Sequence, residues 1–150
     1  MNKHWLWILL PLLAAGVLWL FGKAPSRYAL EQECRRYQEE RVLEEHRFRR
    51  ESGRLIEDGR AGADTKAALA ARRAAHERYL LDHRRLEMGG WTVLLIPPGA
   101  TPPPAGDFHR AASHDPSLSD DAPHLRGGME IRLAPRGGLA RLVSRLGLSP

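Results

Sequence analysis

The side chains that could bind a metal ion or transfer protons gather in one segment, residues 97–128. Its imidazole and carboxylate groups are His109, His114, Asp115, Asp120, Asp121 and His124. Such groups are common ligands of divalent metals. Their spacing matches no metal-binding template, and gathering ligands from a segment rich in Pro, Gly and Ser would cost conformational entropy. We therefore expect neither a bound metal nor a cofactor.

The rest of the chain lacks the patterns that are typical of enzymes. His76-Glu77 would begin a zinc-protease motif, but Leu80 stands where the second histidine is required. There is no Gly-x-Ser-x-Gly, no phosphate-binding loop and no dinucleotide-binding fingerprint. His76 and His83 are best interpreted as solvated side chains of a helix. The sequence therefore predicts a protein that is not an enzyme and has no small-molecule substrate.

The distribution of charge also limits the range of partners. The formal net charge is +5, but residues 26–88 hold 15 basic and 13 acidic side chains. The excess of positive charge lies in residues 126–150, which contain five arginines and one acidic residue, Glu130. Without aromatic platforms or a phosphate-binding loop, this pattern does not predict nucleic-acid binding. Cys34 is the only cysteine, so an internal disulfide is excluded; it could join two copies of the chain or remain a passive thiol.

An apolar stretch of nineteen residues without formal charge separates Lys3 from Lys23. As a helix it would reach about 28 Å, close to the hydrocarbon thickness of a bilayer. A cleaved signal peptide is the alternative, but Pro25 directly follows the best cleavage site. We expect a transmembrane helix over 5–22 that follows a cytoplasmic tail, residues 1–4.

Residues 26–88 are predicted to form a charged helical stalk with a break near 59–64. Ser26 is a plausible N-cap of the first helix, and Asp64 or Thr65 is a plausible N-cap of the second. Heptad positions of the first helix carry a thin apolar stripe, which is consistent with a loose coiled coil or with a solvated helix. The break allows either a hairpin or a continuous rod.

Residues 89–150 are predicted to form a small α/β element. Gly89-Gly90 ends the second helix, and the β-branched and aromatic run 91–96 predicts a strand. A flexible loop follows over 97–128, and alternation over 129–133 predicts a second strand. A short amphipathic helix with two arginines on its polar face closes the chain. The predicted fold is mainly α, with a transmembrane helix, a stalk that could be a coiled coil, and two strands with a short helix.

The stretch Gly128-Met129-Glu130-Ile131-Arg132-Leu133, followed by Leu139, Leu142, Val143 and Leu146, resembles part of a known family. The family comprises inner-membrane assembly proteins of secretion and pilus machines, of the type II secretion M type and type IV pilus O type. The resemblance covers about 20 residues and implies a strand that leads into a helix of a ferredoxin-like domain. It also implies a scaffold that dimerises and holds other subunits, without catalytic residues.

Two other classes remain open. Leu18-Trp19-Leu20-Phe21-Gly22-Lys23 before a helix, and Leu86-Glu87-Met88-Gly89-Gly90 before a strand, are similar to division proteins of the FtsB and DivIC type. An N-terminal apolar segment with a charged body is also similar to phage inner-membrane spanins.

The sequence thus predicts an integral scaffold of the bacterial inner membrane, with its bulk in the periplasm and with protein partners or a second copy of the chain. The candidate partner-binding residues are apolar positions of the first and last helices: Leu30, Tyr37, Phe48, Leu55, Leu139, Leu142, Val143 and Leu146.

Overall fold

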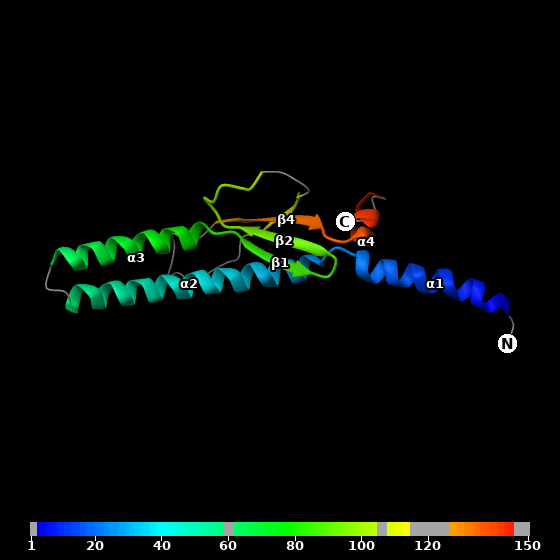
Figure 1. The fold of residues 1–150 in the computed structure, drawn as a ribbon, viewed down its shortest axis with the longest axis horizontal. Coiled ribbons are helices and arrows are strands. Elements are labelled where there is room, and N and C mark those ends of the chain that lie inside the picture. Colours follow the sequence, from blue (N-terminus) through cyan, green and yellow to red (C-terminus); the bar gives the residue numbers. More distant parts are fainter. Residues whose placement is uncertain (1–2, 59–61, 105–107, 115–126, 146–150) are drawn as a thin grey trace.

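The computed structural model describes residues 3–58, 62–104, 108–114 and 127–145. Within these ranges, the side chains of residues 3–4, 6, 18–21, 63, 110–114, 139 and 143–144 are not described. The molecule is elongated (Figure 1): a helical hairpin lies at one end, a small sheet in the middle, and the N-terminal helix extends beyond the other end.

The longest element is α2 (Arg27–Asp58), and its start follows the sequence prediction. The Ser26 hydroxyl accepts a hydrogen bond from the backbone N–H of Ala29 at 3.3 Å, so Ser26 is the N-cap. Six side chains of α2 are buried at helical spacing along one face: Leu30, Cys34, Tyr37, Gln38, Arg41 and Glu45. This buried face is apolar at Leu30 and Cys34 and polar at Arg41 and Glu45, because two different parts of the molecule cover it.

The second helix of the predicted stalk is α3 (Ala63–Leu81). It lies alongside the distal half of α2, so these two helices form a hairpin rather than a rod (Figure 1). Its N-cap is Gly62, which makes no side-chain capping bond. The predicted caps are therefore wrong. Asp64 lies inside the first turn, where its carboxylate interacts favourably with the helix dipole. The helix also ends at Leu81 rather than near residue 88.

A four-stranded antiparallel sheet follows, in the order β1-β2-β4-β3. The strands are β1 (Arg84–Met88), β2 (Trp91–Ile96), β3 (His109–His114) and β4 (Met129–Pro135). Strands β2 and β4 occupy the two predicted segments. The prediction of only two strands is wrong, because β1 was assigned to the helix and β3 to the flexible loop. Pairing with β2 and β4 supplies the backbone hydrogen bonds that these two weakly patterned segments need.

The first half of α2 packs on one face of this sheet, and the core lies between them. Its buried side chains come from α2, β2 and β4, with one alanine before α2 and one from the last helix: Ala24, Leu30, Cys34, Tyr37, Trp91, Val93, Leu95, Met129, Ile131, Leu133 and Ala140. Three residues of the heptad pattern, Leu30, Cys34 and Tyr37, therefore pack inside this chain.

The N-terminal helix, α1 (Lys3–Gly22), forms over the predicted apolar stretch. The prediction that it is a transmembrane helix is nevertheless wrong for the described residues, because no helix among them is long and apolar enough to cross a bilayer.

The last described element is the short helix α4 (Gly138–Arg145), which coincides with the predicted terminal helix. It contacts both β4 and α1, so it lies where α1 meets the body of the molecule. The buried Ala140 joins α4 to the core.

Candidate interaction surfaces

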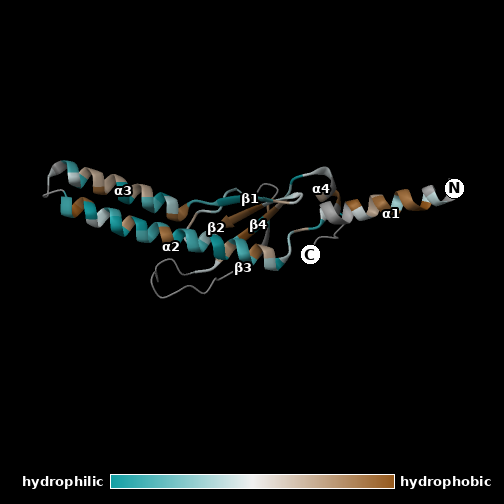
Figure 2. Cartoon of the chain, turned by 90° about the horizontal axis from the view of Figure 1, so that it is seen from below, coloured by the Kyte–Doolittle hydropathy of each residue, from teal (hydrophilic) through white to brown (hydrophobic). Residues whose placement is uncertain are grey.

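The surface of α1 is the most apolar exposed part of the described chain. Side chains are exposed without interruption from Trp7 to Val17, about three helical turns, so no side of this stretch is covered. The exposed fraction of its large apolar side chains runs from 39% at Val17 to 81% at Trp7. Figure 2 shows the contrast between the largely hydrophobic α1 and the largely hydrophilic α2. Contiguous apolar surfaces of this kind are typical of interaction sites.

The C-terminal end of α1 is attached to the sheet by a defined contact. The indole Nε1 of Trp91, on β2, donates a hydrogen bond to the carbonyl oxygen of Gly22 at 3.1 Å. Gly22 and Ala24 are buried at this junction. The carbonyl belongs to the last turn of α1, where no helical N–H is available to it. Trp91 therefore fixes the point at which α1 leaves the body.

The helix α4 presents positive charge beside this junction. Arg141 and Arg145 are exposed and stand four residues apart, so they share one face of α4. Leu142 is also exposed, at 48%. Of the other predicted partner-binding residues here, Leu139 and Val143 lie on α4 but their side chains are not described, and Leu146 lies outside the described residues.

The base of the α2–α3 hairpin is held by buried side chains of α2 that reach the end of α3. The Tyr37 hydroxyl donates to the Asp82 carbonyl at 2.6 Å, and Arg41 Nη2 donates to the Leu80 carbonyl at 3.0 Å. Arg41 Nη1 also donates to Gln38 Oε1 at 2.7 Å. A guanidinium at a helix C-terminus is favoured by the helix dipole. Burial nevertheless lowers the pKa of Arg41 below its ordinary value.

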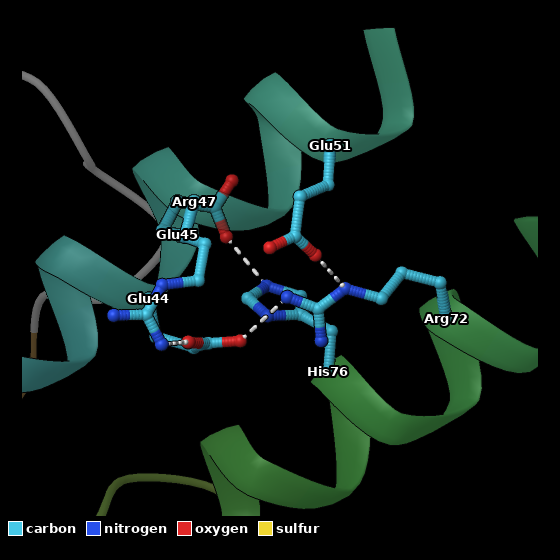
Figure 3. A network of polar contacts seen from close by, with 6 residues as sticks. All are labelled: Glu44, Glu45, Arg47, Glu51, Arg72 and His76. Carbon is cyan, nitrogen blue, oxygen red and sulfur yellow. Dashed lines mark hydrogen bonds and ion pairs between the residues drawn. The ribbon is translucent and has the colours of Figure 1, made fainter. Parts of the chain in front are cut away.

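Farther along the hairpin, a polar network joins the two helices (Figure 3). His76 Nε2 lies 2.7 Å from Glu45 Oε2, and both side chains are almost fully buried. The His76 ring stacks on Phe48 with centroids 4.2 Å apart and an interplanar angle of 3°. The expectation that His76 is a solvated side chain is therefore wrong, because Phe48 and Glu45 cover it.

Arg72 forms the second part of the network. Its Nη2 donates to Glu44 Oε1 at 2.9 Å, and its Nε lies 2.8 Å from Glu51 Oε2, an ion-pair distance without hydrogen-bond alignment. Arg47 adds a hydrogen bond to Glu44. Glu44, Glu45 and Glu51 of α2 are thus each engaged in ion pairs within the chain.

An open groove of about 550 Å³ lies between the distal halves of α2 and α3. Its apolar lining includes Phe48 and Ile56, and two cations, Lys66 and Arg73, also line it. Ser52 lines this groove, and its buried hydroxyl has no hydrogen-bond partner among the residues that the structure describes. The groove is a concave and mainly apolar surface of the hairpin.

The predicted partner-binding residues of α2 are therefore divided between two environments. Leu30 and Tyr37 are core residues of this chain, and Phe48 contributes to both the His76 stack and the groove. Leu55 is half-buried near the tip of the hairpin. The sequence pattern does not predict Trp91 as an attachment point or Arg41 as a link between helices. The one sign in the sequence is that the charged Arg41 stands at a position of the heptad pattern where an apolar side chain is expected.

No group of three or more metal-ligating side chains occurs among the described residues. His109 is exposed on β3, while Asp115, Asp120, Asp121 and His124 of the predicted loop lie outside the described residues. His114 belongs to β3, but its side chain is not described.

Comparison of the chain with protein-family models, with curated proteins and with solved structures gave no match.

Proposed function

We propose that this chain is a membrane-associated scaffold protein of an envelope assembly. In this proposal α1 is buried in lipid, while the hairpin and sheet form a rigid body that holds protein partners. The observation that carries the proposal is the continuous exposure of apolar side chains around α1 from Trp7 to Val17.

Lipid suits this surface better than a protein groove does. A helix that is apolar on all sides is stable when its whole circumference is removed from water. A groove on a partner would cover one side and leave the other exposed. The proposal concerns burial of α1 in lipid and does not require α1 to cross the bilayer.

The body of the molecule supports a scaffold role. Buried contacts of Tyr37 and Arg41 with the end of α3 fix the two helices of the hairpin relative to each other. Much of the charge along the hairpin is used in ion pairs that connect its own helices. The groove near Phe48 then provides a shaped surface on a rigid support, which is the arrangement that a protein-binding element needs.

Vesicle flotation of the full chain tests the lipid contact. Leu12→Glu places a charge on α1, whereas Leu43→Glu places it on α2 at a leucine of almost equal exposure, 65% against 63%. We expect the unsubstituted chain and Leu43→Glu to float with phosphatidylcholine vesicles, and Leu12→Glu to float poorly. Equal flotation of the two variants, or no flotation of the unsubstituted chain, would contradict the proposal.

The location and the partners require a separate experiment in cells. We expect the chain to fractionate with the inner membrane and to be cross-linked to neighbouring proteins through a photoreactive residue at Ile56, beside the groove. The same probe at Tyr28, an exposed position at the other end of α2, is the control. A chain found only in the soluble fraction would contradict the envelope location.

A further inference from the structure

The helix α4 combines positive charge with an exposed apolar side chain at one place on the molecule. On a helical wheel, Leu142 stands within about 100° of both Arg141 and Arg145 and on the far side from the buried Ala140. The solvent-facing side of α4 is therefore cationic with an apolar flank. A helix of this composition is typical of the boundary between headgroups and acyl chains.

The two arginines of α4 differ from other arginines near this end of the body. Arg27 is paired with Glu31, Arg132 with Glu130, and Arg136 with Glu87. In contrast, neither Arg141 nor Arg145 forms an ion pair with any part of the chain that the structure describes. Their charge is thus available to an anion from outside the chain.

The position of α4 relative to α1 suggests which anion this is. The two helices are in contact, and Trp91 fixes the end of α1 beside them. If α1 is buried in lipid, as the proposed function states, the junction of α1 with the body lies at headgroup level. The arginines of α4 are then within reach of lipid phosphates, which guanidinium groups bind through paired hydrogen bonds.

We propose that α4 is a binding site for anionic phospholipid headgroups, with Arg141 and Arg145 contacting phosphate and Leu142 entering the acyl boundary. This inference rests on the proposed burial of α1 in lipid. The contribution of a basic side chain at such a surface corresponds to about a fivefold gain in affinity, or about 25-fold for two.

The experiment measures flotation of the full chain with two kinds of vesicle, phosphatidylcholine alone and phosphatidylcholine mixed with phosphatidylglycerol. The test variant is Arg141→Gln/Arg145→Gln. The matched control is Arg50→Gln/Arg54→Gln, which removes an exposed arginine pair of the same spacing from α2. Circular dichroism checks that both variants remain folded.

We expect the unsubstituted chain and the control to bind the anionic vesicles about 25-fold more tightly than the neutral ones. The α4 variant should lose this preference and retain binding to neutral vesicles. Arg141→Lys/Arg145→Lys, which keeps the charge but not the paired hydrogen bonds of the guanidinium, should keep part of the preference. Excess inorganic phosphate at constant ionic strength should leave the preference intact. If α4 were instead a site for free phosphate, the added phosphate would displace the lipid and abolish the preference.

Two results would overturn the inference. One is equal binding of the unsubstituted chain to both vesicles, which would leave the burial of α1 in lipid standing. The other is an unchanged preference in the α4 variant. A chain that binds neither vesicle would instead contradict the proposed function itself.

Discussion

The indole of Trp91 and the carbonyl of Gly22 are joined by a buried hydrogen bond of 3.1 Å, although 69 residues separate them in the sequence. This bond links the last turn of α1 to the second strand of the sheet. It is complemented by Ala24, which packs in the same core as Trp91. The direction in which α1 leaves the body therefore depends on the sheet.

Trp91→Phe should lower the free energy of unfolding by about 2 kcal/mol, because the Gly22 carbonyl would be buried without a donor. Urea unfolding in a mild detergent, followed by circular dichroism, measures the change. Trp7→Phe is the control, since Trp7 is 81% exposed. The control should stay within about 0.5 kcal/mol of the unsubstituted protein. Equal effects of the two substitutions would show that the hydrogen bond has no special role.

The turn between β1 and β2 gives a second prediction. Met88 pairs with Trp91, so Gly89 and Gly90 form a two-residue hairpin turn, and Gly89 has a φ of 60°. Gly89→Ala should destabilise the protein by about 1 kcal/mol, although no atom of the described residues lies within 4 Å of the new Cβ. Gly53→Ala, also free of obstruction but inside α2, should stabilise it by about 0.5–1 kcal/mol. Thermal unfolding of both variants measures the two opposite signs, and the same sign in both would refute this account.

The same turn explains part of what the sequence could and could not predict. Gly-Gly was interpreted as the end of a helix because Arg84-Arg85-Leu86-Glu87-Met88 consists of good helix formers. Antiparallel pairing with β2 overrides this local preference. Strands β2 and β4 were predictable, because β-branched and alternating residues carry the signal directly.

Among the residues of the core and of the candidate surfaces, the roles of some could be predicted from the sequence and the roles of others could not. Ser26 could be assigned as an N-cap because its effect is local. The roles of Leu30 and His76 depend on which element covers them, and that follows from the hairpin and from the sheet order. The apolar surface of α1 was visible in the sequence because it needs no tertiary contact to define it.

The buried pair of Glu45 and His76 gives a third prediction. In a double-mutant cycle with alanine at both positions, we expect a coupling energy of about 1–2 kcal/mol from chemical unfolding, since neither side chain is more than 8% exposed. The exposed pair of Arg27 and Glu31 serves as the comparison, because its arginine is 85% exposed. Its coupling should be about 0.5 kcal/mol or less. Comparable values for the two cycles would mean that burial does not strengthen the hairpin contact.

The last prediction concerns the single thiol. Cys34 is fully buried between α2 and the sheet, and burial raises its pKa to about 12, with the nearby Glu31 and Glu33 adding to the effect. The native thiol therefore stays protonated at mildly alkaline pH, where an unfolded cysteine, with a pKa of about 8.5, begins to ionise. Its contribution to stability should be complete below about pH 8.5 and should decrease as the pH rises toward 12.

Ellman's reagent provides the measurement. We expect the native protein to react slowly and the urea-unfolded protein to react at once, because the thiolate is the reactive form. Leu43→Cys in a Cys34→Ala background is the control, since position 43 is 65% exposed and should react without urea. Rapid reaction of Cys34 in the native protein, or a disulfide-linked dimer on a non-reducing gel, would contradict its burial. The dimer would favour the alternative that this cysteine joins two copies of the chain.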